Sequence, residues 1–182
     1  RECFLVRPGD KPYVAIDGVG SNLGSFYVLR TNDGGDTWWQ MAELRGSDTG
    51  EGDQCGYSVA IAGDTVVAGS PYRSSWRGAV YVSRTSDGGA TYPQVAKLTA
   101  SDAASADYFG YSVAIDGATI VVGAIGDDDA GSGSGSAYVF RTTDGGATYV
   151  EVAKLTASDA ASNDNFGISV AIDGDTIVVG AY

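Results

Sequence analysis

Hydrophobic and polar residues follow strand-like patterns in several short stretches, most clearly in the second half of the chain. In Tyr111–Asp116 apolar and polar positions alternate, which predicts a half-buried strand. After a turn that contains glycine, Thr119–Ala124 is a β-branched apolar run, typical of a strand covered on both faces. Two further strands are predicted on either side of an Asp-Gly-Gly turn, at Ser136–Thr142 and Thr148–Ala157.

This four-strand pattern recurs along the chain at a nearly fixed period. The Asp-Gly-Gly turns begin at Asp33, Asp87 and Asp144, with spacings of 54 and 57 residues. A second set of turn glycines has spacings of 54, 54 and 57 residues, at Gly9, Gly63, Gly117 and Gly174. Self-similarity of this kind is the signature of a repeat protein. We therefore predict three repeats and half of a fourth, with boundaries 1–54, 55–108, 109–165 and 166–182.

Four antiparallel strands in roughly 55 residues form one blade of a β-propeller. The predicted fold class is therefore all-β, with about 3.5 blade-like repeats of 54–57 residues. Because closed propellers typically contain about four to eight blades, we expect a partial or open propeller, or a segment of a longer array. An open stack of β modules that forms a fibre is the alternative. The chain does not begin with Met and shows no signal-peptide pattern, which indicates a processed protein or a piece of a longer one.

The three Asp-Gly-Gly turns read "TNDGGDTW", "TSDGGATY" and "TTDGGATY". They resemble the Asp box, S/T-x-D-x-G-x-T-W/F/Y, which occurs in sialidases and in many β-propeller proteins without that activity. The resemblance implies a hairpin between the outer two strands of a blade, remote from any catalytic centre. An Asp that accepts backbone N–H groups and glycines with positive φ suit such a turn. We predict a structural role for Asp33, Gly35, Thr37, Asp87, Gly89, Thr91, Asp144, Gly146 and Thr148.

Nearly the whole chain resembles the FG-GAP repeat, known from the propellers of integrin α-subunits and from large secreted surface proteins. The Phe-Gly pair is present at Phe109–Gly110 and at Phe166–Gly167, and "VVGA" stands where Gly-Ala-Pro is expected. Cys55–Gly56 replaces Phe-Gly in the second repeat, and "RECFLV" fills the slot in the first. The resemblance implies an extracellular or cell-surface β-propeller with a role in adhesion.

Composition and charge exclude several kinds of partner and site. The net charge is −12 and the pI is near 4.1, so the phosphate backbone of a nucleic acid would be repelled. The chain has no histidine, which removes the commonest general base and the commonest zinc ligand. The longest apolar runs, such as Thr119–Ile125, are too short to span a bilayer. We expect neither nucleic-acid binding nor a membrane span.

Consecutive acids in the third repeat, Asp127, Asp128 and Asp129, are the candidate metal ligands. FG-GAP loops of integrins bind Ca²⁺ through alternating acids, and the resemblance implies Ca²⁺ as the one candidate cofactor here. The alternation is missing in this loop, so a solvated acidic loop is the competing interpretation. A pair of acids also precedes each Phe-Gly slot, at Asp48/Asp53, Asp102/Asp107 and Asp159/Asp164. For these pairs we favour turns between blades over metal binding.

The two cysteines fit one disulfide in an oxidising compartment, although two unrelated buried thiols fit the sequence as well. In the FG-GAP alignment Cys3 lies two places beyond the slot that Cys55 fills. The two residues would then lie on corresponding strands of adjacent blades. A disulfide between blades is therefore one of the two open interpretations.

The loop that varies most between repeats is the candidate binding site. The second repeat has "SPYRSSWRG" where the third has an acidic loop, and its Tyr72, Arg73, Trp76 and Arg77 are residue types that dominate binding hot spots. Aromatic faces also suit stacking on sugars. We hypothesise that the basic loop of one copy docks on the acidic loop of another, and that Arg73→Glu with Arg77→Glu abolishes assembly. A Trp that only covers a blade edge is the competing interpretation.

A sialidase needs three arginines that grip one carboxylate. Arg30, Arg84 and Arg141 occur once per repeat, so whole blades separate them and they cannot converge. No catalytic residue is therefore assigned, and we expect a protein that is not an enzyme. The predicted function is a cell-surface adhesion segment or a structural protomer of a surface filament, with self-association or other surface proteins and glycans as partners. A carbohydrate-binding or sialidase-like propeller is the alternative.

Overall fold

The structure is a computed structural model that describes residues 13–17 and 24–182. The described strands form four antiparallel sheets, in which strands adjacent in sequence pair with one another. The first sheet contains β1 (Tyr13–Asp17), β2 (Phe26–Arg30) and β3 (Trp39–Leu44). The second contains β4 (Ser58–Ala62), β5 (Thr65–Ser70), β6 (Ala79–Arg84) and β7 (Gln94–Leu98), with the short turn α1 (Arg73–Trp76) between β5 and β6.

The third and fourth sheets repeat the same plan. The third contains β8 (Phe109–Asp116), β9 (Thr119–Ala124), β10 (Ser136–Arg141) and β11 (Val150–Leu155). The fourth contains β12 (Ser169–Asp173) and β13 (Thr176–Gly180). The predicted all-β fold with blades of four antiparallel strands is confirmed, because the second and third sheets each have that composition.

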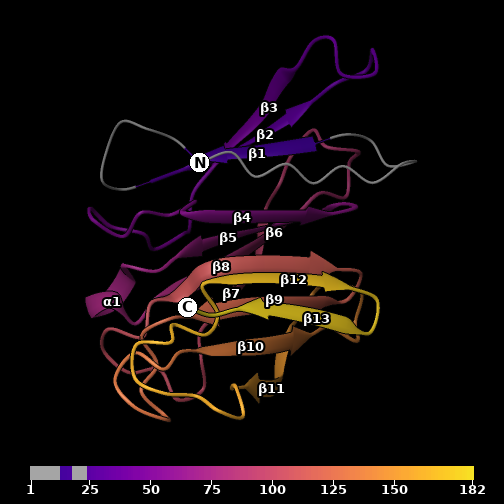
Figure 1. Cartoon of the computed structure of the whole chain (residues 1–182). Coiled ribbons are helices and arrows are strands. Elements are labelled where there is room, and N and C mark those ends of the chain that lie inside the picture. The colour runs from indigo at the N-terminus through magenta and orange to yellow at the C-terminus, as the bar shows by residue number, and fades with distance from the viewer. Residues whose placement is uncertain (1–12, 18–23) are drawn as a thin grey trace.

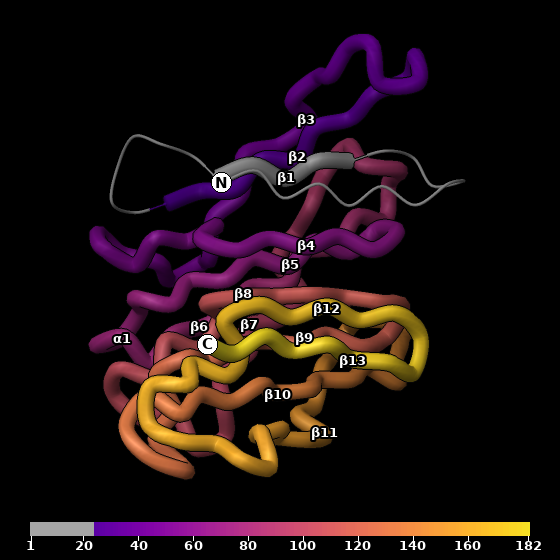
Figure 2. Tube along the Cα trace, viewed as in Figure 1, coloured from indigo at the N-terminus to yellow at the C-terminus, as the bar shows by residue number. Residues whose placement is uncertain are grey.

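The sheets stack face to face along the chain (Figure 1). The apolar core lies between them. Between the second and third sheets, Val67 and Val82 pack with Phe109, Ile120 and Phe140. Between the first and second sheets lies a separate cluster, which includes Phe26, Val28, Val66, Cys55 and Tyr81. β-Branched residues fill the middle strands because these strands are covered on both faces. In the described part of the chain the sheets form an open stack, as expected for a partial or open propeller (Figure 2).

The glycine of each Phe-Gly pair lies against a glycine of the preceding blade, either Gly123 of the VVGA motif or its counterpart Gly69. A Cβ added at Gly123 on β9 would lie 2.0 Å from the carbonyl oxygen of Gly167, which leads into the fourth sheet. A Cβ added at Gly69 on β5 would lie 2.0 Å from the carbonyl oxygen of Gly110. The Ser112 hydroxyl donates to that Gly167 oxygen at 2.7 Å. Glycine at both motif positions therefore sets how closely adjacent blades approach.

Candidate functional site

The Asp-box carboxylates bond entirely within their own hairpins, which join the last two strands of each of the first three sheets. Asp87 Oδ1 accepts the Thr85 hydroxyl at 2.8 Å and the Thr91 N–H at 2.9 Å, and its Oδ2 accepts the Thr91 hydroxyl at 2.6 Å. Asp33 and Asp144 make the corresponding bonds. The threonine hydroxyls and backbone N–H groups favour the ionised form, and they hold the pKa of all three carboxyls well below the ordinary value.

These depressed pKa values predict an acid-sensitive contribution to stability. A carboxyl whose pKa is lowered by folding stabilises the fold above its ordinary pKa of 3.8, and this contribution is lost progressively as the pH falls below that value. We expect Asp87→Asn to lower the melting temperature by a few degrees at pH 7, and the difference from the wild type to narrow towards pH 3. Thermal unfolding across this pH range measures the effect. Glu51→Gln, at an exposed carboxylate before β4, is the control, and an equal loss there would contradict the assignment.

Two of the arginines that occur once per repeat lie against the Asp box of the next blade. Arg30 at the end of β2 donates from Nη1 to the Gly88 carbonyl oxygen at 3.0 Å. Arg84 at the end of β6 lies beside the following hairpin, where a Cβ added at Gly146 would be 2.9 Å from its Nη1. Arg141 is exposed at the end of β10. These arginines follow successive blades, and in the first two the guanidinium joins adjacent hairpins.

The second acid of each pair before the Phe-Gly slot stabilises a turn in the connection between blades. Asp53, Asp107 and Asp164 each accept the backbone N–H of the residue three positions earlier, at 2.8, 2.5 and 2.7 Å. Burial raises the pKa of Asp107, and the negative charges of the nearby Asp127 and Asp102 raise it further. The observed bonds are those of side chains that cap a turn.

The first acid of the first two pairs has a different role, which the sequence did not reveal. Asp48 accepts the Tyr81 hydroxyl at 2.7 Å and pairs with Lys97 Nζ at 2.7 Å. Asp102 repeats the arrangement one blade later with Tyr138 at 2.8 Å and Lys154 at 2.6 Å. Tyrosine and lysine lie opposite each other on the third and fourth strands. This Asp–Tyr–Lys clamp fixes the connection between blades to the sheet that follows it. The recurrence of Tyr and Lys at a 57-residue spacing was the available signal.

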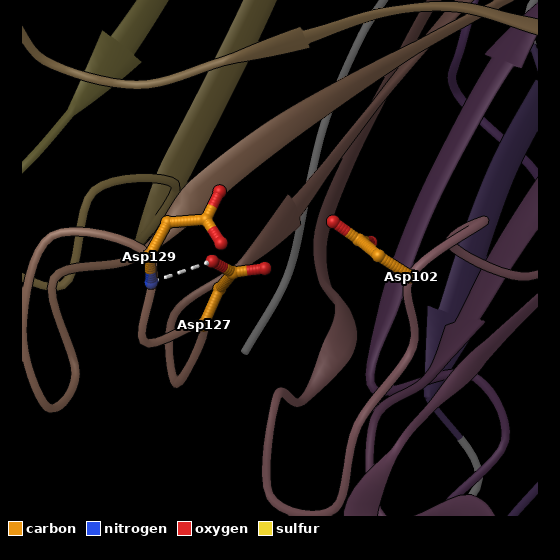
Figure 3. Close-up of side chains that lie close together, drawn as sticks. All are labelled: Asp102, Asp127 and Asp129. Atoms are coloured by element: carbon orange, nitrogen blue, oxygen red, sulfur yellow. Dashed lines mark hydrogen bonds between the residues drawn. The ribbon is translucent and has the colours of Figure 1, made fainter.

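The candidate metal ligands are brought together only in part. Asp102, Asp127 and Asp129 each place a carboxylate oxygen within 4.8 Å of the others and could hold a metal ion (Figure 3). Asp102 comes from the preceding connection, across from the loop that carries the other two (Figure 3). Asp128 is outside this group, and its Oδ1 accepts the Gly133 N–H at 2.7 Å.

A cation from the chain itself lies among these three carboxylates. Lys154 Nζ is 2.6 Å from Asp102 Oδ2, 2.9 Å from Asp127 Oδ2 and 2.6 Å from Asp129 Oδ2. Desolvation lowers the pKa of the ammonium, but hydrogen bonds to the three carboxylates outweigh it and raise the pKa above its ordinary value. Desolvation opposes ionisation of Asp102, yet the bonds from Lys154 and Tyr138 keep its pKa below the ordinary value.

The candidate binding loop divides into a buried part and an exposed part. The Arg73 side chain is only 17% exposed and pairs with Asp48 at 2.6 Å and Asp53 at 3.2 Å. The Trp76 side chain is 52% exposed, and its ring stacks on Tyr108 with centroids 6.1 Å apart. The Tyr72 ring meets the rings of Tyr57 and Tyr108 edge-on, and Arg77 is exposed. The loop therefore presents an aromatic and basic surface without the Arg73 guanidinium.

The backbone of this loop also joins two blades. Ser74, Ser75 and Trp76 have φ of 53°, 61° and 65°, a left-handed turn that L-residues rarely adopt. In that turn the Trp76 carbonyl accepts the Tyr108 N–H at 2.8 Å and the Arg77 carbonyl accepts the Phe109 N–H at 3.1 Å. The equivalent loop of the third blade makes the same contacts with residues 163–166. The turn geometry therefore serves the joint between blades.

The disulfide prediction concerns Cys3, which lies outside the described residues. Cys55 is buried in the cluster between the first and second sheets, beside Phe26 and Val59. The pairing of Cys3 with Cys55 thus remains a prediction.

The stacked four-stranded sheets, the Asp-box hairpins and the glycine contacts between blades define a propeller-type β-repeat protein. The FG-GAP repeat family matches three stretches of the chain, residues 38–83, 92–140 and 149–182, which together exceed half of its length. The chain belongs to the FG-GAP repeat family. No curated protein matches it. Within residues 13–17 and 24–182, no helix has the length and apolar character needed to cross a membrane.

Proposed function

We propose that this chain is a segment of an extracellular β-propeller without enzymatic activity, which acts in cell-surface adhesion or as a structural protomer of a surface filament. Membership of the FG-GAP family carries the proposal, because these repeats are typical of extracellular proteins and are often associated with adhesion. Enzymatic turnover of a panel of sialosides or other glycans would overturn the non-enzymatic role.

The use of the charged side chains supports a structural role. The Asp-box carboxylates bond within their hairpins, and Arg30 reaches the hairpin of the next blade. Asp48 and Asp102 are paired with lysines of the following sheet. These carboxylates and basic side chains, which are of the types that a hydrolase uses for acid and base chemistry, are engaged here in shaping hairpins and in holding blades together.

We further propose that self-association uses Arg77 and Trp76 against the acidic loop of a second copy. Both side chains are exposed, and the Asp128 loop has the opposite charge. Arg73 is excluded from this surface because Asp48 and Asp53 of its own chain hold it. Residues of these types at the centre of an interface supply much of the binding energy.

Reversing the charge of Arg77 tests this surface. We expect Arg77→Glu to weaken association about tenfold or more, because a like charge then faces the acidic loop. Sedimentation velocity gives the association constant, and negative-stain images show whether filaments or strings of discs persist. Arg141→Glu makes the same charge change at the outer end of β10 and should leave association intact. Equal behaviour of the two variants would contradict the proposed surface.

A carbohydrate-binding role is the second candidate, and the row of aromatic rings favours it. Trp76 stacks on Tyr108, which meets Tyr72, and Tyr72 in turn meets Tyr57. Partly exposed rings of this kind offer faces on which sugars can stack. Incubation of the protein with a glycan panel separates the candidates, since glycan binding without self-association favours this second role.

The proposed role does not require Ca²⁺. The sequence-based prediction of Ca²⁺ rests on the acids of the third repeat, and the three carboxylates that could hold an ion surround Lys154 Nζ at 2.6 to 2.9 Å. Ca²⁺ takes about six to eight oxygens at about 2.3–2.6 Å, so it cannot share this position with the ammonium. In this arrangement the residues do not fit the ion.

A further inference from the structure

The ammonium of Lys154 matches its surroundings in donor number, and its charge is opposite in sign to theirs. An ammonium has three N–H donors, and Lys154 Nζ has one carboxylate oxygen of Asp102, Asp127 and Asp129 within 2.9 Å for each of them. The Lys154 side chain is 19% exposed, and its Nζ also lies 5.3 Å from the centre of the Tyr138 ring. Three carboxylates within 4.8 Å of one another would repel strongly without a cation between them.

In the second blade, two cations of the chain neutralise the corresponding carboxylate, Asp48. Lys97 corresponds to Lys154 and pairs with Asp48 at 2.7 Å. Arg73 stands in the second repeat where the third has Asp127, and it reaches the same Asp48 at 2.6 Å. The connection leading into each four-stranded blade is thus held by a carboxylate and at least one cation that the chain itself supplies.

We infer that Lys154 is a tethered cation that replaces the divalent ion expected at this FG-GAP loop, and that it makes the joint between the second and third blades independent of Ca²⁺. The lysine reaches from β11 to both the preceding connection and the loop after β9, which are the two segments that a bound ion would join. Removal of the ammonium leaves three carboxylates around one point, an arrangement that can then take a divalent cation. This inference does not depend on the adhesive role proposed above.

Thermal unfolding with and without Ca²⁺ tests the inference. The wild-type melting temperature should be the same in EDTA and in millimolar Ca²⁺, within about 1 °C. Lys154→Met, which keeps the apolar stem and removes the charge, should melt lower in EDTA. Added Ca²⁺ at about 100 times its Kd should raise its melting temperature by about 5–10 °C.

The matched control is Lys97→Met in the second blade. Asp48 keeps Arg73 and the Tyr81 hydroxyl in that variant, so Ca²⁺ should not change its melting temperature. A Ca²⁺-dependent rise in the wild type would overturn the inference, and so would a folded Lys154→Met that Ca²⁺ does not stabilise. If Lys154→Met folds only when Ca²⁺ is present, the inference is supported. If it folds in neither condition, Lys154→Gln takes its place, and failure of both variants to gain stability from Ca²⁺ contradicts the inference.

Discussion

Gly123→Ala should destabilise the protein by at least about 3 kcal/mol and detach the fourth sheet from the third. The added Cβ would lie 2.0 Å from the Gly167 carbonyl oxygen and 2.4 Å from Ser112 Oγ. Gly167 is held in place, since its N–H donates to Gly180 and its carbonyl accepts the Ser112 hydroxyl. The clash can therefore be relieved only by moving β12 away from β9. Denaturant unfolding measures the loss of stability, and limited proteolysis between residues 156 and 168 reports the detachment.

Gly117→Ala is the matched control in the same sheet. Gly117 lies in the turn between β8 and β9 with φ of 54°, and no atom lies within 4 Å of an added Cβ. The cost there is the left-handed conformation alone, about 1–2 kcal/mol. If the two variants lost equal stability, backbone conformation rather than contact between blades would explain the glycine of the VVGA motif.

Phe109→Ala should cost about 3–5 kcal/mol of folding free energy, because it leaves a cavity in the core between the second and third sheets. The Phe109 side chain is fully buried and its ring meets Tyr138 at 5.5 Å and Phe140 at 5.9 Å between centroids. Its loss also removes packing beneath Tyr138, whose hydroxyl lies 2.8 Å from Asp102. The clamp between blades should loosen together with the core, and denaturant unfolding gives the free energy.

Phe166→Ala provides the comparison at the same motif position one repeat later. Phe166 is only half-buried, so truncation should cost about 1–2 kcal/mol. A similar loss for both phenylalanines would show that motif position, rather than burial between complete blades, decides the contribution of the Phe-Gly pair.

Much of the fold could be predicted because its signals are local. The strand prediction for Thr119–Ala124 coincides with β9, and that for Tyr111–Asp116 falls within β8. The Asp-box turns bond within eight residues, so their geometry depends on residues that are neighbours in sequence. Alternation, β-branching and turn residues each act over a few positions, which is why a single sequence reveals them.

The candidate site could be predicted only in part, since it depends on residues far apart in sequence. Asp102 joins Asp127 and Asp129, while Asp128 bonds to Gly133 instead. Lys154 lies in the predicted strand Thr148–Ala157, and nothing local shows that it reaches across 52 residues to Asp102. Similarly, Arg73 is a residue type that is common in binding sites, but its carboxylate partners lie in the preceding connection, about 20 residues away or more. The local pattern does not show this pairing.

The repeat period, the blade as the unit and the hairpin that closes each blade can all be derived from the sequence, because the pleat and the turn impose their periods on nearby residues. Which charges meet depends instead on how the blades pack. Packing one blade on the next brings the connection, the loop and the fourth strand together, and the carboxylates that gather there need a cation between them because like charges at this spacing repel. In the third blade that cation is Lys154, and this assignment follows from the stacking of whole sheets rather than from any single stretch of the chain.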